Sequence, residues 1–202
     1  MNRNDLVLKE KFNEFEKMFP PFLRDESMLC IDSVAEGWEW CFSDKAIVLE
    51  KLDGTNVKLE VVDGILSVYA RHAKSKGYIL ANLNDANYKY ILQGVSNTIA
   101  NRSKRFKDGT YYGELLGPKF QGNPYNLSEH VWLNFKPNSG GVEVYKDYPK
   151  CSDFNEWKNW ILNLKSKLNP EVEAEGVIFL NRETGEMAKL RKDMFSNEYS
   201  HR

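Results

Sequence analysis

The sequence predicts an α+β domain made largely of antiparallel sheets flanked by helices. Residues 46–71 and 174–191 contain short apolar runs joined by glycine turns, which is typical of β-hairpins. Segments 86–101 and 153–168 carry apolar residues near a 3.6-residue period, which is typical of helices that bury one face. Hairpins with helices interspersed indicate a mixed, mainly antiparallel fold.

Each element has its own pattern in the chain. We expect three strands within 46–71, a helix over 86–101, strands over 110–117 and 130–135, a helix over 153–168 and a hairpin over 174–191. A further helix is expected over 5–18, where apolar side chains recur at helical spacing until Pro20-Pro21 ends it. Ser152 is the predicted N-cap of the helix that follows it.

Length and composition bound the class of protein. A chain of 202 residues suits one domain, and a formal net charge of −1 argues against a uniformly basic nucleic-acid binder. Three scattered cysteines form no metal-ligand pattern and indicate a reducing compartment. The start has no apolar signal segment, and no run approaches the roughly 18 apolar residues of a membrane span. We expect a soluble cytoplasmic protein that does not associate with membranes.

The turn Asp63-Gly64 predicts the pairing of the strands around it. A two-residue Asp-Gly loop favours a type I′ hairpin, in which residue 62 faces 65 and, further along, Asn56 faces Arg71. Directly opposed residues point to the same face of a sheet. Local chain geometry therefore brings Arg71 beside Asn56.

The turn Glu183-Thr184-Gly185 predicts the second hairpin. A three-residue loop that ends in glycine would set residue 179 opposite Lys189 and residue 177 opposite Arg191. In that register Glu175 shares a face with both cations. A two-residue loop would instead turn the acid away from them.

Lys51 has the features of a nucleophilic amine. It stands at the end of the apolar run 46–49 and precedes a glycine turn. Attack on a triphosphate needs a neutral amine, and an unperturbed lysine is neutral in about one molecule in 2,500 at pH 7. Cations such as Lys189 and Arg191, together with desolvation, would lower its pKa. The same cations would bind phosphates and stabilise a leaving pyrophosphate.

Two acidic residues complete the predicted chemistry. Glu114 and Glu175 offer hard carboxylate oxygens, which suit Mg²⁺ or Mn²⁺ or a hydrogen bond to ribose. The alternative for each of these acids is an ordinary surface position, and Lys51 taken alone is more simply a solvated charge. Their order along the chain is what gives them weight.

Five stretches in order resemble the nucleotidyltransferase motifs I, Ia, III, IV and V of DNA ligases, RNA ligases and mRNA capping enzymes. They are 50–56, Arg71, 112–115, 175–179 and 189–192. The resemblance implies the nucleotidyltransferase (ATP-grasp-like) fold of the DNA/RNA ligase type in a single domain over 1–202. Residues 1–25 would form an N-terminal helix and entry segment. Because the chain ends about ten residues after the fifth motif, no C-terminal OB domain is expected.

The resemblance also implies roles for single residues. Lys51 would carry the covalent AMP, with Lys189 and Arg191 as the two basic positions of motif V. The residues expected to bind the nucleotide are Glu50, Asp53, Gly54, Asn56, Arg71, Glu114, Phe135 and Glu175. Glu50 would contact the adenine edge, and Phe135 would stack on adenine. Glu114 and Glu175 would also serve the metal.

The run 113–125 favours one branch of this family. Its pattern Gly-Glu-x-x-Gly-Pro-x-x-Gln-x-Asn resembles the end-joining RNA ligases. The aspartate that often follows the stacking aromatic is replaced here by Lys136. The chain is thus expected to resemble an RNA ligase more than a DNA ligase or a capping enzyme.

The implied reaction has three steps. Lys51 takes AMP from ATP, AMP passes to an RNA 5′-phosphate, and a 3′-hydroxyl then displaces AMP and seals the strand. Mg²⁺ or Mn²⁺ would be the metal, and RNA would contact basic residues at Lys119, Arg102, Lys104 and Arg105. Two alternatives stay open: an adenylyltransferase or ligase acting on DNA nicks, and a nucleotide- or RNA-binding relative without turnover. The natural RNA and the oligomeric state stay open as well.

Overall fold

The computed structural model describes residues 18–72, 77–82, 84, 86–101, 106–135, 142 and 144–199, with His72 described in its backbone alone. The chain forms two compact units, one from 1–51 with 143–202 and one from 52–142. The predicted helix over 5–18 lies outside the described residues except for Met18, as do Arg102, Lys104 and Arg105. No helix among the described residues is long and apolar enough to cross a membrane.

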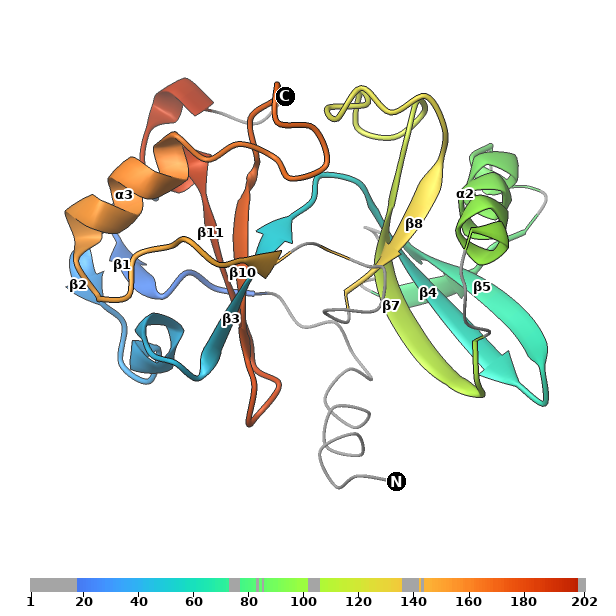
Figure 1. The fold of residues 1–202 in the computed structure, drawn as a ribbon, viewed down its shortest axis with the longest axis horizontal. Coiled ribbons are helices and arrows are strands. Elements are labelled where there is room, and N and C mark those ends of the chain that lie inside the picture. Colours follow the sequence, from blue (N-terminus) through green and yellow to red (C-terminus); the bar gives the residue numbers. More distant parts are fainter. Residues whose placement is uncertain are drawn as a thin grey trace. The chain divides into compact units, whose positions relative to one another are not determined.

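The first unit is built on a four-stranded antiparallel sheet (Figure 1). Its strands lie in the order β11-β10-β3-β9: Met187–Arg191, Gly176–Asn181, Ala46–Lys51 and Val144–Tyr145. A separate pair joins β1 (Phe22–Arg24) to β2 (Cys30–Val34), and helix α3 spans Phe154–Leu162. Short 3₁₀ helices cover Glu39–Phe42, Lys192–Met194 and Asn197–Tyr199. The sequence did not predict β1, β2 or β9, which are only two to five residues long.

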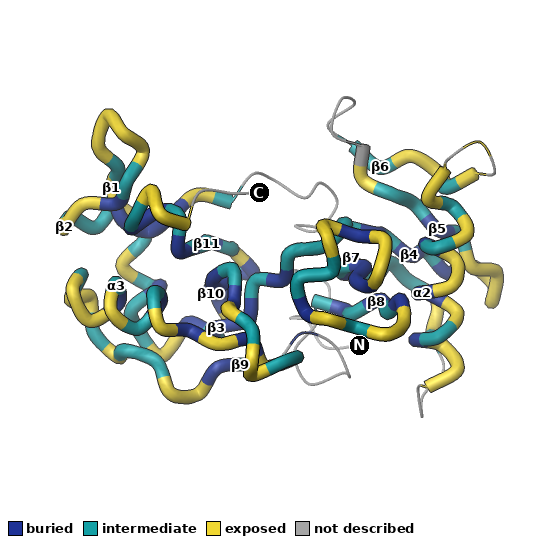
Figure 2. Tube along the Cα trace, turned by 90° about the horizontal axis from the view of Figure 1, so that it is seen from above, coloured by how far each residue is buried: buried dark blue, intermediate teal, exposed yellow. Residues whose placement is uncertain are grey.

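The core of this unit lies on one face of the sheet. Trp157 and Ile161, one helical turn apart on α3, are fully buried against Val177 and Phe179 of β10. The tryptophans of α3 therefore belong to the core, as their helical spacing indicates. Figure 2 shows the central strands of each unit as buried or intermediate, with exposed residues in the turns.

Helix α3 differs from its prediction at both ends. Its N-cap is Asp153 instead of Ser152, because the Asp153 carboxylate accepts the backbone N–H of Glu156 at 2.8 Å. The helix ends at Leu162, six residues earlier than expected. Leu164 remains buried, but its carbonyl accepts from the N–H of Ala174 in a returning chain segment. The apolar spacing thus continues past the helix because a turn buries the next leucine.

The second unit is built on a five-stranded antiparallel sheet covered by helix α2 on one face (Figure 1). The order β6-β5-β4-β7-β8 corresponds to Gly77–Leu80, Ile65–His72, Thr55–Val62, Gly109–Leu116 and Val131–Asn134, and α2 spans Tyr88–Ala100. Val57, Leu59 and Trp132 are fully buried beneath α2 residues such as Ile91. The opposite face of the sheet carries the alternate, more polar positions.

The Asp63-Gly64 hairpin is confirmed in type and register. Both residues have positive φ, 51° and 75°, as a type I′ turn requires. Val62 faces Ile65, and the pairing continues to Val57 opposite Ala70. The next pair in this register is Asn56 and Arg71.

The second hairpin is shifted by one residue from its prediction. Phe179 faces Ala188, and Lys189 faces Ile178. The backbone N–H of Asn181 donates to Glu186, which closes a loop of four residues instead of three. The Asn181 carboxamide also accepts from the N–H groups of Glu183 and Thr184, and these bonds stabilise the longer loop.

The backbone at Gly176 redirects Glu175 in this register. Regular alternation would send Glu175 to the core face, because Val177 and Phe179, two and four residues further along, are both buried in the core. Gly176 has a φ of +158°, and a Cβ on it would lie 2.1 Å from the carbonyl oxygen of Leu190. Only glycine fits this close approach, and the Glu175 carboxylate turns to the face that carries Lys51.

Replacing Gly176 with alanine is expected to destabilise the first unit by more than about 2 kcal/mol, since a strained φ and a steric clash add together. Gly37 is a matched control, because it also has a positive φ, +84°, but nothing lies within 4 Å of its missing Cβ. Gly37→Ala should cost about 1 kcal/mol. Urea unfolding of the two variants measures the difference, and equal losses would contradict the close-approach argument.

Candidate functional site

Lys51 lies at the C-terminal end of β3 in a partly buried ion pair. Its Nζ is 2.5 Å from Oε2 of Glu175, and the two side chains are 18% and 10% exposed. Arg191 approaches the other carboxylate oxygen at 3.7 Å and also pairs with Asp193 at 2.8 Å. Gly176 faces both Lys51 on β3 and Arg191 on β11, which puts the two cations on one sheet face. The predicted grouping of Lys51, Glu175 and Arg191 is therefore present, although the predicted register is wrong.

Lys189 belongs to the same group. It lies two residues before Arg191 on β11 and faces Ile178, which in turn faces Leu49 of β3. Burial lowers the pKa of Lys189, and the nearby charges of Arg191 and Lys51 lower it further. Three cations thus share one face with the Glu175 carboxylate, and Asp193 pairs with one of them, Arg191. A group of cations of this kind suits a polyanionic ligand such as a phosphate chain.

Glu50 points to the other face of β3. It is 1% exposed, and its Oε2 accepts the backbone N–H of Lys167 at 2.9 Å. Its strand partner Val177 lies in the core. Burial, followed by the charge of Glu50, raises the pKa of Tyr145, so this tyrosine lies near the acid. In this structure Glu50 fastens a loop to the sheet, and contact with adenine stays a prediction.

In the second unit, the run 113–125 supports the loop that follows Lys51. The backbone N–H of Asp53 donates to the hydroxyl of Tyr125 at 2.7 Å. The carbonyl of Gly54 accepts from Nε2 of Gln121 at 3.1 Å. A Cβ on Gly54 would meet the carbonyl oxygen of Leu115 at 2.5 Å. The run that resembles RNA ligases therefore fixes the backbone of the Asp53-Gly54 turn.

The polar face of the five-stranded sheet gathers the remaining predicted residues. Asn56 faces Glu114 across β4 and β7, and Arg71 faces Tyr78 across β5 and β6. The backbone N–H of Phe135 donates to Tyr112, which places Phe135 on the same face as Glu114. Asn56, Arg71, Glu114 and Phe135 thus share one sheet face. Lys119 is exposed in the segment between β7 and β8.

Tyr78 is a site candidate that the sequence did not predict, and it packs against Tyr112 of the stretch 112–115. The Tyr78 hydroxyl donates to Oδ1 of Asn56, and its ring centroid lies 5.6 Å from that of Tyr112. Burial, then Tyr112, raises the pKa of Tyr78, while Arg71 acts in the opposite direction. Strand β6 was not predicted because only four residues form it. A prediction that residues 77–80 form a strand paired with β5 would have placed Tyr78 opposite Arg71 and made it a site candidate.

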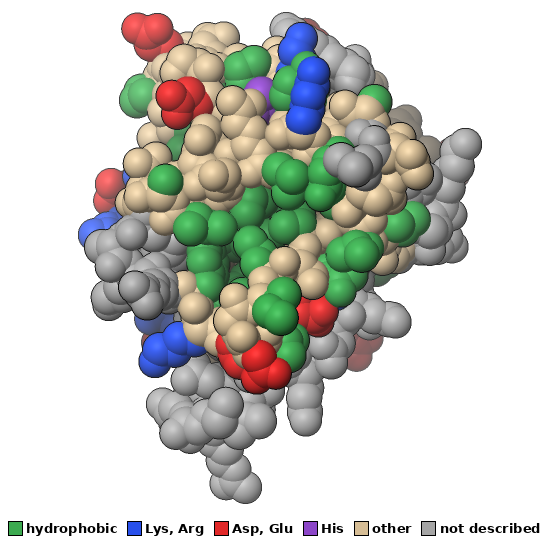
Figure 3. Space-filling model, turned by 90° about the vertical axis from the view of Figure 1, so that its right-hand side faces the viewer, with side chains coloured by type: hydrophobic (Ala, Val, Ile, Leu, Met, Phe, Trp, Pro, Cys, Tyr) green, Lys and Arg blue, Asp and Glu red, His purple; other side chains and the backbone are tan. Residues whose placement is uncertain are grey.

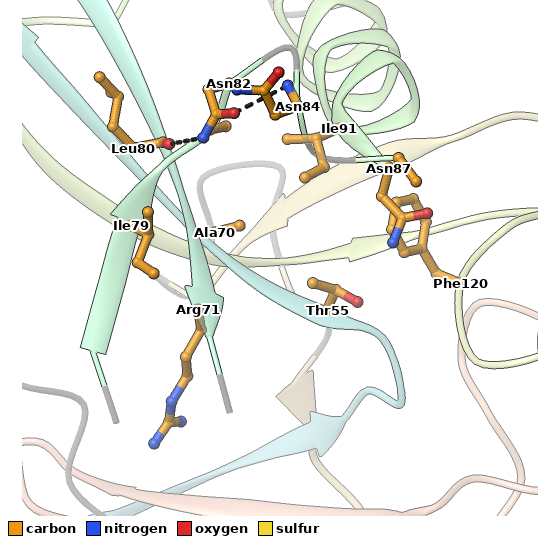
Figure 4. Close-up of a pocket in the computed structure, with 12 residues that line it drawn as sticks. Thr55, Ala70, Arg71, Ile79, Leu80, Asn82, Asn84, Asn87, Ile91 and Phe120 are labelled. Carbon is orange, nitrogen blue, oxygen red and sulfur yellow. Dashed lines mark hydrogen bonds between the residues drawn. The ribbon is translucent and has the colours of Figure 1, made fainter. Parts of the chain in front are cut away.

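A cavity of about 590 Å³ opens in the second unit. Figure 4 shows its walls coming from β5, β6, the start of α2 and the loop between them. Its lining is Thr55, Ala70, Arg71, Ile79, Leu80, Ala81, Asn82, Asn84, Ala86, Asn87, Ile91 and Phe120. Of the residues predicted to bind the nucleotide, Arg71 alone lines it.

The predicted metal-binding residues suit a metal ion held jointly by protein and substrate better than one held by protein groups alone. Within the described ranges, no group of three or more His, Cys, Asp or Glu is arranged to hold a metal ion. Mg²⁺ commonly binds one or two carboxylates together with substrate phosphates. Glu175 is such a carboxylate, on the face that also presents three cations. Metal binding there would need a ligand that also supplies oxygens.

The fold is similar to that of solved RNA ligase structures. A Naegleria gruberi RNA ligase with PPi matches with a TM-score of 0.54 and 18% identity, over 80% of this chain and 53% of that chain. A mutant of the Naegleria gruberi ligase with ATP and Mn matches with a TM-score of 0.52, 18% identity and coverages of 81% and 54%. Another mutant, with AMP and Mn, matches with a TM-score of 0.51, 19% identity and coverages of 80% and 52%.

This chain spans about half the length of the RNA ligase structures it matches. No family model matches the sequence, and no curated protein does so either. At this identity the likeness establishes the fold, an α+β arrangement of antiparallel sheets.

The lowered pKa of Lys189 predicts a pH dependence of stability. Its charged form is disfavoured in the folded chain, so the stability cost is present below the folded pKa and declines as pH rises toward 10.5. Lys189→Met removes this cost, and its advantage in free energy of unfolding should shrink from pH 7 to pH 10. Urea unfolding across that range measures the difference. The same substitution at the exposed Lys107 is the control, and an equal trend there would contradict the argument.

Proposed function

We propose that this chain is an ATP-dependent RNA ligase of the covalent lysyl-nucleotidyltransferase type. The observation that carries the proposal is the ion pair of Lys51 with Glu175, on a sheet face that also presents Lys189 and Arg191. The likeness of the fold to RNA ligase structures supports it. Residues 1–202 would make up a single nucleotidyltransferase domain.

In the first step Nζ of Lys51 attacks the α-phosphorus of ATP. A P–N bond forms, the bond from the α-phosphorus to the bridging oxygen breaks, and pyrophosphate leaves. Glu175 holds the amine in place through its hydrogen bond and can take a proton from it. Lys189 and Arg191 bind the phosphates and stabilise the charge that develops on the leaving group. A bound Mg²⁺ or Mn²⁺ would neutralise phosphate charge, with Glu175 and Glu114 as the carboxylates to hold it.

In the later steps the residues of the polar sheet face would hold RNA. An RNA 5′-phosphate oxygen attacks the phosphorus of the lysine-bound AMP, and the P–N bond to Lys51 breaks. A 3′-hydroxyl then attacks the phosphorus of the RNA 5′-phosphate. The bond from that phosphorus to the bridging oxygen breaks, and AMP leaves with this oxygen. Arg71 supplies a fixed cation for the 5′-phosphate, and the Asn56 amide supplies a neutral donor beside it. Phe135 would stack on adenine, and Lys119 would contact the RNA backbone.

Mixing the protein with ATP and Mg²⁺ or Mn²⁺ is expected to add the mass of one AMP at Lys51. Lys51→Ala should abolish the addition. Lys45→Ala is the matched control, because Lys45 precedes the same strand but forms an exposed ion pair with Glu183. Intact-mass spectrometry and peptide mapping read the result. Label on another lysine would overturn the assignment of the nucleophile. Absence of label on the wild type would overturn the ligase proposal and favour a protein that binds a nucleotide or RNA without turnover.

Tyr78→Phe is expected to slow AMP transfer to a 5′-phosphorylated RNA about tenfold, because Asn56 loses the hydroxyl that holds its amide. Labelling of Lys51 by ATP should change less than twofold. Tyr69→Phe is the control, since it removes a hydroxyl that donates to Glu60 on the same sheet face. Rapid-quench kinetics separate the two steps, and equal effects of the two variants would contradict the role of Tyr78. Substituting 5′-phosphorylated DNA tests the preference for RNA.

A further inference from the structure

The cavity of the second unit has an unusual lining for a phosphate site. Asn82 and Asn84 lie together at one end and Asn87 lies beside Phe120 (Figure 4), and Arg71 is the one charged residue among those that the structure places around the cavity. Ile79, Ile91 and Phe120 provide apolar walls, in keeping with ligand pockets of roughly 300–1,000 Å³. A triphosphate would call for several cations. This lining suits a ligand in which a neutral group that forms hydrogen bonds is attached to a single anionic group.

The arrangement of the polar groups further restricts the class of ligand that fits the cavity. In Figure 4 the guanidinium of Arg71 points away from the asparagine end. Asn82 is fixed by the loop, since it donates to the carbonyl of Leu80 and accepts from the N–H of Asn84. A carboxamide pairs a donor with an acceptor, which matches the edge of a nucleobase. Apolar side chains on the facing walls suit the flat faces of a base.

Arg71 connects this cavity to the polar sheet face. Its neighbour Ala70 faces Ile79, so both of these lie on the α2 side of the sheet. Arg71 alternates to the other side and yet lines the cavity at its end. A nucleotide whose phosphate lies at Arg71 can therefore place its base on the α2 side. Figure 3 shows apolar side chains gathered on one side of the molecule. Two apolar residues that line the cavity, Ile79 and Leu80, are 45% and 53% exposed.

We propose that this cavity binds the base of the 5′-terminal nucleotide of the RNA, with the terminal phosphate at Arg71. The proposal rests on the proposed RNA ligase function. A base held between Ile79, Ile91 and the asparagines is not paired with a complementary strand. Flipping a paired base out of a duplex costs a few kcal/mol, whereas an unpaired end avoids that cost. The substrate class is therefore RNA with a single-stranded 5′ end, in preference to a nick in a duplex.

The test uses a substitution that fills the cavity. Ala86→Trp puts a large ring on a lining residue, and Ala100→Trp puts the same ring on the exposed far end of α2. With 5′-phosphorylated single-stranded RNA, Ala86→Trp should raise the KM for AMP transfer at least tenfold, and Ala100→Trp less than twofold. Labelling of Lys51 should stay within twofold in both. The wild type should act at least tenfold better on the single strand than on the same end at a nick.

The outcomes separate the two proposals. A wild type without AMP label overturns the ligase function, and binding of a 5′-phosphorylated dinucleotide, followed by fluorescence anisotropy, then tests the cavity alone. Loss of Lys51 labelling in Ala86→Trp would mean that the cavity serves ATP. Unchanged RNA kinetics, or a preference for the nick, would also overturn the inference. If Ala86→Trp does not fold, Ile79→Glu replaces it, with Ile65→Glu, on an exposed position outside the cavity, as control.

Discussion

The ion pair between Lys51 and Glu175 is the interaction on which the candidate site depends. Its partners are 124 residues apart in sequence and meet because β3 and β10 are neighbours. An ammonium that is only 18% exposed needs a partner, since leaving one charge of such a pair uncompensated is strongly destabilising. Glu175 thus holds the amine in a defined place at the end of its strand. The same pair keeps Lys51 in contact with a carboxylate on a face that also presents Lys189 and Arg191.

Glu175 reaches Lys51 through the backbone at Gly176, and this shows what a sequence pattern can and cannot predict. Asp-Gly turns are specific, and the hairpin at 63–64 has the predicted type and register. The turn at 183–185 is less specific, because Asn181 adds side-chain hydrogen bonds that lengthen the loop. The acid and the cations meet even so, since the glycine breaks the alternation that a regular strand would impose. Their sequence order indicated the group, but not the backbone distortion that assembles it.

Other differences have similar local causes. The end of α3 could not be predicted from apolar spacing, because Leu164 is buried although it lies in a turn after the helix. A leucine in a longer helix would give the same spacing. The inward position of Glu50 depends on the backbone N–H of Lys167, more than a hundred residues away. Tyr78 lies on a strand too short to show a period. In each case either the deciding contact joins distant parts of the chain, or the structural element is shorter than one repeat of the sequence pattern.

The contacts around the Asp53-Gly54 turn have a consequence for ionic strength. The Tyr125 hydroxyl and the Gln121 amide hold this turn through hydrogen bonds between uncharged groups. Dissolved salt screens interactions between charges and leaves such bonds almost untouched. The ammonium, guanidinium and carboxylate groups around Lys51 interact through charge and are partly open to solvent. Raising the salt concentration therefore weakens the electrostatic half of the site while the geometry of the turn persists.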